Sequence, residues 1–585
     1  MAGFRYNAAM YLKRCGQSRA RKNGDFWVLV ESHRTKRGPR QRVVAYLGDM
    51  EKAACIGAKQ AAMDRPRSWQ SRLFDEEGEP EWVEVDSKRV RVERVRDFGG
   101  YWLGLQLLDK LGLIALLDQK LLVGRADIPW STMVLTLVLM RLCEPSSELR
   151  IAEHSYERSI LGDLLGIPAE KVNDDRLYRA LDKLLPHKEE LEKHLKVRLG
   201  ELFGLEYDLL LYDITSTYFE GACEDNEKAR FGYSRDKRSD CKQVCIGLVV
   251  SREGMPLGYE VFAGNRADVS TVKEIVEKIE RQYGKANRIW VMDRGMISEK
   301  TLALLRSEGR RYIVGTPRGQ LRQFEGELSS KEGWEEIAEG LSAKLIAAED
   351  GKEWFILCRS EARGSQEKAM LARFEARIEA GLRKLETACA GEKRLRQATV
   401  ERRIGALLSK NSRAKGLFKV AVGFREDGGA SVRWEKLAKP AQWTALKEGC
   451  YLLRTNVEGK VEELWRSYIQ LTEAEAAFRI EKGDLGIRPI WHQKEERVEA
   501  HILVCFLGYV LRKTLAQMCK AAGLGTEPRK VFDEIAQIKV VDVVMPTKSG
   551  VTIRKRCIAQ PTKPQAILLQ ALQLKLPQRM KVQEM

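Results

Sequence analysis

The stretch from Leu209 to Gly221, LLLYDITSTYFEG, constrains the fold more than any other part of the sequence. Its apolar, aromatic and β-branched residues predict a buried strand that is covered on both faces. Asp213 interrupts this strand, and aspartate is both depleted in strands and costly to bury without compensation. An isolated aspartate often bonds a nearby backbone N–H. The functional interpretation therefore depends on whether other carboxylates converge on Asp213.

Length and charge limit the class of protein. A chain of 585 residues exceeds what one hydrophobic core usually serves, so we expect about two to four domains. The 101 lysines and arginines outnumber the 83 acidic residues and give a net charge of +18, which favours a polyanionic partner, either nucleic acid or an anionic membrane surface. No apolar run approaches the ~18 residues of a membrane span, and the N-terminus lacks the apolar core of a signal peptide. We therefore expect a soluble intracellular protein.

The N-terminal third divides into two regions. Residues 1–98 form a basic region and a linker, in which FWVLVE (26–31) and RVVAYLG (42–48) predict a small β-hairpin with a turn at Gly38-Pro39. Residues 99–205 show helical periodicity and carry scattered arginines. This helical region fits a helix-turn-helix-like DNA-binding module and, equally well, a helical domain packed on a neighbour.

Residues 206–318 predict a mixed α/β sheet. After the first strand, CIGLVV (245–250) and PLGYEVFAG (256–264) read as a hairpin, and an amphipathic helix follows at 270–283. RIWVMDRG (288–295) is a fourth strand, ending in Asp293, and RYIVGTP (311–317) is a fifth. The order β-β-β-α-β-α-β is that of the ribonuclease H-like fold, in which two such aspartates lie on adjacent central strands. Chemistry in open α/β sheets gathers at strand carboxyl ends, where Asp293 lies.

Residues 319–457 predict an interruption of this sheet by a β-rich insertion with a helical arm. The arm is a charged helical segment (366–410) that Gly391 breaks into a hairpin. Residues 458–525 return to the core and begin with a helix at 462–482, on which Glu475 shares a face with apolar neighbours. Residues 526–585 form a C-terminal tail.

Asp213, Asp293 and Glu475 thus form a set of three carboxylates in the succession strand, strand, helix. Such oxygen ligands suit Mg²⁺, for which Mn²⁺ would substitute. Two ions about 4 Å apart would activate a water or a 3′ hydroxyl for in-line phosphoryl transfer. Bound cations also resolve the mutual repulsion of three neighbouring carboxylates.

At these residues the chain resembles a DDE transposase of a bacterial insertion sequence, from the group with a β-rich insertion and a Tyr-x2-Arg-x3-Glu-x6-Lys signature. The resemblance rests on YDITSTYFEG around Asp213, VMDRGM around Asp293 and the segment from Tyr468 to Gln493. Tyr468, Glu475 and Lys482 fall at signature positions, whereas Leu471 stands where many members have arginine.

The resemblance implies cut-and-paste transposition on double-stranded DNA. The enzyme would bind the terminal inverted repeats of its own element, hydrolyse a strand at each end and use the 3′ hydroxyl for strand transfer, often through a hairpin. Arg294, Tyr468, Arg479 and Lys482 would contact DNA phosphates near the scissile bond. A homodimer is expected at synapsis, because two element ends must be joined, and the location would be cytoplasmic and nucleoid-associated.

Two other functions stay open at this point. An inactive or domesticated sequence-specific DNA-binding protein would use the same fold without chemistry, and a nuclease would cleave without strand joining. Two further groups of residues have alternative roles: His492 and His501 as packing residues or phosphate contacts, and four tryptophans of the insertion as core residues or as platforms for a flipped base, Trp334, Trp354, Trp434 and Trp443.

Overall fold

The computed structural model describes residues 83–580, apart from 123, 125–126, 392–394, 426–427 and 578, and three strands nearer the N-terminus. These strands are β1 (Met10–Cys15), β2 (Phe26–Thr35) and β3 (Gly38–Gly48), paired in that order in one antiparallel sheet. The predicted hairpin corresponds to β2 and β3. Its strands extend further than predicted, since Gly38 and Pro39 are paired within β3 instead of forming the turn. The predicted linker up to residue 82 lies outside the described residues.

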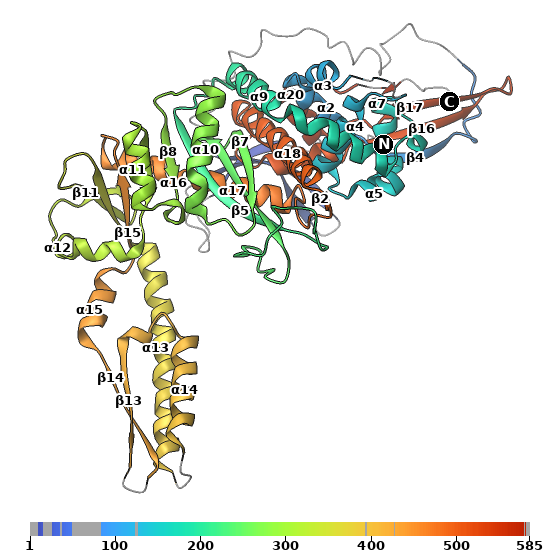
Figure 1. The fold of residues 1–585 in the computed structure, drawn as a ribbon. Coiled ribbons are helices and arrows are strands. Elements are labelled where there is room, and N and C mark those ends of the chain that lie inside the picture. Colours follow the sequence, from blue (N-terminus) through green and yellow to red (C-terminus); the bar gives the residue numbers. More distant parts are fainter. Residues whose placement is uncertain are drawn as a thin grey trace.

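A nine-stranded mixed sheet forms the centre of the molecule, with the strand order β10-β11-β12-β15-β9-β8-β5-β6-β7 (Figure 1). The pairs β5–β8 and β8–β9 are parallel, and β5–β6 and β6–β7 are antiparallel. This arrangement confirms the predicted mixed α/β sheet. The strands of its first part are β5 (Leu209–Tyr218), β6 (Gln243–Ser251), β7 (Pro256–Ala263), β8 (Ile289–Met292) and β9 (Arg311–Gly315).

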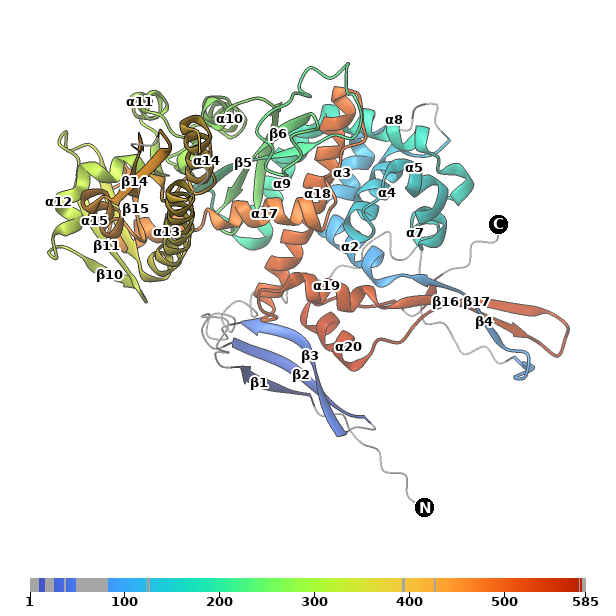
Figure 2. The same ribbon diagram turned by 90° about the horizontal axis from the view of Figure 1, so that it is seen from below.

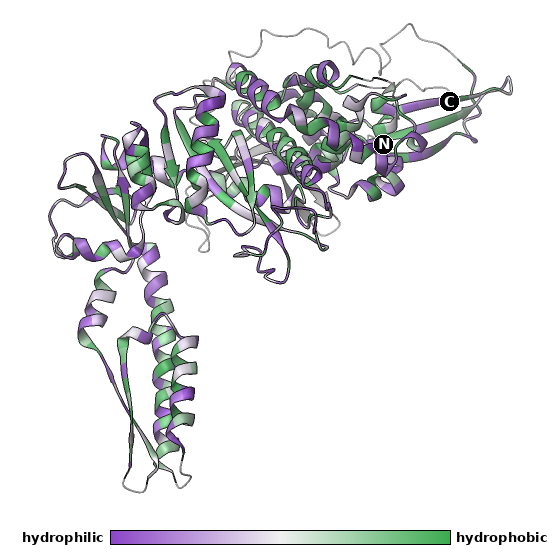
Figure 3. Cartoon of the chain, viewed as in Figure 1, coloured by the Kyte–Doolittle hydropathy of each residue, from purple (hydrophilic) through white to green (hydrophobic). Residues whose placement is uncertain are grey.

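Helices cover both faces of this sheet, as the alternation of side chains along β5 requires. Leu210 and Tyr212 belong to a core cluster with the helices α10 (Asp268–Tyr283) and α11 (Glu299–Ser307). Leu209 and Leu211 belong to the larger cluster on the opposite face, which includes α17 (Thr472–Gly483) and α18 (Glu495–Ala521). Figure 3 shows hydrophobic residues along these inner strands and helices.

The segment predicted as an insertion has two structurally different parts. The strands β10 (Glu335–Ala338), β11 (Leu341–Ala347), β12 (Trp354–Ser360) and β15 (Cys450–Thr455) continue the central sheet, because β15 pairs antiparallel with β9. The remainder is an arm that projects from the body (Figure 1). The arm consists of α13 (Glu361–Ala390), α14 (Gln397–Lys410), the ribbon β13 (Phe418–Phe424) with β14 (Ala430–Lys436), and α15 (Ala438–Leu446).

The helices between residues 99 and 203 share one hydrophobic core with α18. Helix α18 is long and apolar enough to cross a membrane, but 83% of its most apolar window is buried inside the molecule, as in the core helix of a globular domain. The chain thus joins the predicted helical region and the second part of the core in a single body. The larger helices of this region are α2 (Gly99–Lys110), α3 (Leu113–Lys120), α4 (Trp130–Cys143), α8 (Asp174–Leu184) and α9 (Lys188–Phe203).

The C-terminal segment returns to the N-terminal part of the chain. The strand β4 (Arg91–Asp97) pairs antiparallel with β16 (Lys539–Pro546), beside β17 (Thr552–Ile558) and β18 (Arg579–Met580), as Figure 2 shows for β4, β16 and β17. The helices α19 (Pro528–Ala536) and α20 (Lys563–Ala571) complete this end. Strands from distant parts of the sequence therefore form one small sheet.

Candidate active site

Two carboxylates lie at the same level of neighbouring strands. The parallel strands β5 and β8 pair Tyr212 with Met292, and Asp213 and Asp293 are the next residues along each strand. Asp213 is two residues after Leu211, so its side chain points to the face of the sheet that α17 and α18 cover. Strand register therefore brings together two residues that are 80 positions apart in the sequence (293 − 213).

Glu475 approaches from the first turn of α17, which packs on β5. The prediction of one continuous helix over 462–482 is wrong, because the structure ends α16 (Val461–Ile469) before α17 begins. At the break, Leu471 N–H bonds to Tyr468 O and Glu473 N–H bonds to Gln470 O. These bonds to the third preceding residue belong to a tighter, 3₁₀-type turn.

The prediction that Glu475 shares the apolar face of its helix is also wrong. Ala474, Ala477 and Phe478 are buried, whereas Glu475 is exposed. The buried stripe of α17 continues at Glu481, seven residues after Ala474, which follows helical periodicity. Glu475 lies just beside this stripe, where a carboxylate stays in water while it faces the end of β5.

The three carboxylates influence one another electrostatically. The pKa of Asp213 is raised to about 6. Burial is the largest cause and the negative charges of Asp293 and Glu475 add to it, whereas a hydrogen bond from Ile214 N–H and the charge of Arg235 act in the opposite direction. That N–H donates to Asp213 Oδ1 at 2.8 Å. The backbone bond expected for an isolated strand aspartate is therefore present, and two further carboxylates are close enough to act on its pKa.

No lysine or arginine of the described residues forms an ion pair with any of these three carboxylates. Among the described residues, one group of three possible metal-binding side chains has its ligand atoms within 4.8 Å of one another, and it consists of Glu148, His492 and His501. The three carboxylates lie further apart than this. A half-buried carboxylate near two exposed ones, none of them ion-paired with the described residues, concentrates negative charge. An all-oxygen donor set of this kind fits a hard divalent cation, so Asp213, Asp293 and Glu475 are the residues that would hold it.

The predicted DNA-contacting residues surround this group in different ways. Tyr468, on α16, donates its hydroxyl to Asp293 Oδ1 at 3.3 Å, so it touches a carboxylate of the site. Arg294 follows Asp293 directly and is exposed, and Arg479 is exposed one turn after Glu475. Lys482 differs, because its Nζ lies 2.9 Å from Asp236 Oδ1 and its side chain is only 13% exposed.

The sequence reasoning missed the segment that holds Lys482. Asp236 lies in the connection between β5 and β6 and pairs with both Lys482 and Arg488. The preceding Arg235 donates to both oxygens of Asp268 at 2.6 Å. The alternating charges of the segment 233–240, YSRDKRSD, were the available signal, but they do not reveal which distant residues pair with them.

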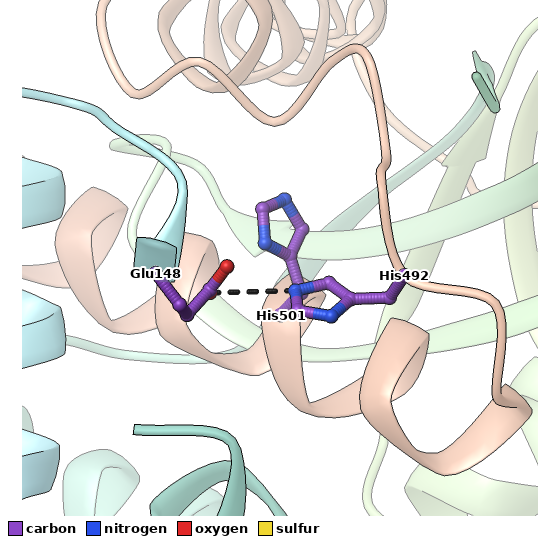
Figure 4. A group of neighbouring side chains, drawn as sticks. All are labelled: Glu148, His492 and His501. Carbon is purple, nitrogen blue, oxygen red and sulfur yellow. Dashed lines mark ion pairs between the residues drawn. The ribbon is translucent and has the colours of Figure 1, made fainter. Parts of the chain in front are cut away.

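A second group of titratable residues is fully buried. Glu148, on α5 (Glu148–Arg150), has its Oε1 3.3 Å from Nε2 of His492, and the ring of His501 lies 5.3 Å from that of His492 (Figure 4). Burial excludes the predicted alternative of phosphate contacts for these histidines. Glutamate and histidine side chains also bind zinc. Whether this group can bind a metal depends on which of its oxygen and nitrogen lone pairs are not already used in hydrogen bonds.

Both ring nitrogens of His501 are already engaged. Arg141 Nη2 lies 3.4 Å from His501 Nδ1, and His501 Nε2 lies 3.3 Å from Ile487 O. Arginine only donates, so Nδ1 accepts and the proton on Nε2 is donated to the carbonyl. Burial and the Arg141 charge hold the pKa of His501 down at about 3. The ring is neutral with no lone pair to offer, so the group works as a hydrogen-bonded link between α4, α5 and α18.

Comparison with known proteins identifies the family. Residues 205–511, more than half of the chain, match the family described as "Transposase DDE domain". No curated protein matches the sequence. Among solved structures, the piggyBac transposase synaptic complex with hairpin DNA is similar at a TM-score of 0.37 and 8% identity, covering 78% of this chain and 82% of that one. Because the family match spans both aspartates, Glu475 and the sheet that positions them, this chain belongs to the DDE transposases, DNA-cleaving and strand-transferring enzymes.

Proposed function

We propose that the protein is a cut-and-paste transposase of a bacterial insertion sequence, with Asp213, Asp293 and Glu475 as its catalytic residues. It binds the terminal inverted repeats of its element, cleaves a strand at each end and joins the 3′ hydroxyl to a new phosphate. The observation that carries this proposal is the convergence of three carboxylates that form no ion pair with the described residues, one within β5, one directly after β8 and one on α17, inside the matched domain. The excess of basic residues supports a DNA substrate.

The same carboxylates would hold the catalytic cations. Mg²⁺ ions, for which Mn²⁺ substitutes, supply activation of the attacking oxygen and stabilisation of the leaving oxygen when they are bound there. The chain's own residues keep the carboxylates in place. Ile214 N–H fixes one oxygen of Asp213, and the Tyr468 hydroxyl fixes one oxygen of Asp293. Both bonds orient ligand oxygens before any substrate arrives, as precise positioning requires.

The basic residues around the carboxylates bind the substrate. Arg294 and Arg479 are exposed beside Asp293 and Glu475 and bind phosphates on either side of the scissile bond. Lys482 is paired with Asp236 in the protein without DNA, so it positions the connection between β5 and β6 and contacts a phosphate that approaches this pair. Two protomers act together at synapsis, because two element ends are joined, and the enzyme works in the cytoplasm at the nucleoid.

The test is cleavage of a labelled duplex that carries an end of the protein's own element, with Mg²⁺, Mn²⁺ or EDTA. The wild type is expected to cleave at the repeat boundary in either metal and not in EDTA, and Glu475→Gln is expected to bind the duplex without cleaving it. Specific binding without cleavage in every metal would instead identify an inactive DNA-binding protein. Cleavage without joining of the 3′ end to a target duplex would identify a nuclease.

A further inference from the structure

The connection between β5 and β6, which is bonded to the strand of Asp213 and to the helix of Glu475, exposes two aromatic side chains. We call residues 230–241, RFGYSRDKRSDC, the aromatic loop. Phe231 is 60% exposed and Tyr233 is 84% exposed. Scattered exposed apolar residues need no explanation, but here two large aromatic rings lie within three residues. Arg235 is paired with Asp268, and Arg238 with Asp240 and Glu220. Arg230 and Lys237 are exposed and form no ion pair with the described residues, so the surface combines ring faces with positive charge. Single-stranded nucleic acid is bound by that combination.

The aromatic loop is anchored at its beginning by backbone contacts. Arg230 and Gln243 exchange N–H to carbonyl bonds of 3.1 and 2.9 Å. The backbone at Gly232 passes so close to the carbonyl of Gly264 that a Cβ there would lie 2.0 Å from its oxygen. Gln243 Nε2 donates to Tyr233 O at 3.1 Å. The exposure of Phe231 and Tyr233 is therefore built into an ordered backbone.

The following residues fasten the aromatic loop to the elements that carry the carboxylates. Arg235 N–H donates to Ser216 Oγ at 3.2 Å, and Ser216 lies three residues after Asp213 on β5. Asp236 pairs with Lys482, which lies seven residues after Glu475 on α17. The loop thus spans from the strand of one carboxylate to the helix of another.

We propose that the aromatic loop binds unpaired DNA bases next to the scissile phosphate, with Tyr233 as the principal stacking residue and Phe231 as the second. The inference rests on the proposed function, which places DNA at these carboxylates. A base that leaves the duplex near the cleavage point exposes its two faces, and an exposed aromatic ring on a loop bonded to β5 and α17 compensates the lost stacking. Arg235 and Asp236 hold the loop and are positioning residues.

Two of the tryptophans of the insertion, Trp334 and Trp434, are poorer platforms. The guanidinium of Arg359 lies 4.3 Å from the centroid of the Trp334 ring, and the Trp334 indole donates to Ser330 O at 3.0 Å. Trp434 packs against Phe418 with their ring centroids 6.0 Å apart. These contacts place both rings in the packing of the insertion, whereas Tyr233 offers its ring to solvent.

The experiment measures binding to a duplex with a short single-stranded overhang that contains 2-aminopurine, beside the blunt duplex. All variants carry Glu475→Gln, so that binding is read without cleavage. The parent is expected to bind the overhang more tightly than the blunt duplex and to quench its fluorescence. Tyr233→Ala is expected to weaken overhang binding about tenfold and to restore the fluorescence, since each stacked base contributes roughly 1–3 kcal/mol. Tyr233→Phe keeps the ring and is expected to bind as the parent does.

Phe424→Ala is the matched control, because Phe424 is 71% exposed on the distant arm. Equal overhang affinity and equal quenching in Tyr233→Ala and the parent would overturn the inference. Element-end cleavage by the protein without Glu475→Gln is measured separately. If cleavage fails while overhang binding depends on Tyr233, the proposed function is wrong and the stacking surface stands; if cleavage occurs and Tyr233→Ala changes neither binding nor quenching, the stacking surface alone is wrong.

Discussion

The two groups of titratable residues in this protein are built in opposite ways. At Asp213, Asp293 and Glu475, negative charge lies near the surface without an ion-paired lysine or arginine among the described residues, although the chain holds 101 of them. At Glu148 and His501, charge and hydrogen-bonding capacity are buried and matched by Arg141, His492 and backbone carbonyls.

This difference indicates that the three carboxylates have a functional role and that the buried group has a structural one. A folded protein leaves like charges together only where a ligand compensates them, and such perturbed sites gather at functional positions. A buried polar group that is fully hydrogen-bonded instead fixes how the packed elements fit together. The residue types alone, one glutamate and two histidines, would have favoured the buried group as the metal site. The hydrogen bonds that these residues already make favour the three carboxylates instead.

The largest expected effect is on catalysis by the open group. Asp213→Asn, Asp293→Asn and Glu475→Gln should each slow strand cleavage roughly a thousandfold, the scale of losing one group that acts in the transition state. Stability should not fall, and Asp213→Asn should raise the melting temperature because it removes a half-buried charge near two like charges. Cleavage assays and thermal melting of the three variants check this. Wild-type cleavage by any one of them would contradict the assignment.

The buried group should show the reverse behaviour. Glu148→Ala removes the partner of His492 and the carboxylate near Arg141, so it should lower the free energy of unfolding by about 3–5 kcal/mol. Glu148→Gln keeps an acceptor for His492 and should lose less. Urea unfolding measures both. Cleavage by the folded protein at low temperature should be retained, and loss of cleavage without loss of stability would mean that this group belongs to the active site.

Divalent ions should distinguish the two groups directly. At about a hundred times its dissociation constant, Mg²⁺ or Mn²⁺ should stabilise the wild type by about 2.7 kcal/mol through binding to the folded state. The stabilisation should vanish in Asp213→Asn and persist in Glu148→Gln, as followed by melting temperature against ion concentration. Zn²⁺ binding that disappears in Glu148→Gln would show that the buried group is a metal site after all.

The same contrast explains what the sequence could reveal. The mixed sheet was predictable because its strands are local apolar runs between turn residues. Asp213 stood out because it interrupts such a run, and Asp293 because it directly follows one. Glu475 was placed by its position in a motif, whereas its surroundings were predicted wrongly, because helical periodicity across 462–482 does not show the turn at Leu471.

Long-range pairing could not be predicted. Arg141 donates to Gly486 O across 345 positions, and β4 pairs with β16 from the other end of the chain. The local sequence around each of these residues does not identify its distant partner. The continuation of the sheet through β15 was hidden for the same reason, since a strand pattern predicts a strand and not its neighbour.

The smallest expected effect is the pH dependence that the buried group gives to stability. The pKa of His501 is held at about 3 in the folded protein and returns to its ordinary value near 6.5 on unfolding. Below pH 6.5 the unfolded state therefore binds a proton that the folded state does not, and stability falls as pH falls, by about 1.4 kcal/mol at pH 5.5. Glu148 does not change the stability in this pH window. Its pKa is about 2 in the folded protein and near 4.3 in the unfolded chain, so its stabilising contribution is lost only as the pH falls below about 4.3.

Comparing the wild type with His501→Gln isolates this contribution. Glutamine offers an oxygen to Arg141 and an N–H to Ile487 O without titrating. Urea unfolding at pH 7.5 and 5.5 should show a larger loss for the wild type than for the variant. Equal losses would mean that His501 takes up a proton in the folded protein, which its contact with the Arg141 guanidinium opposes, and the description of the buried group as a neutral, saturated link would then be wrong.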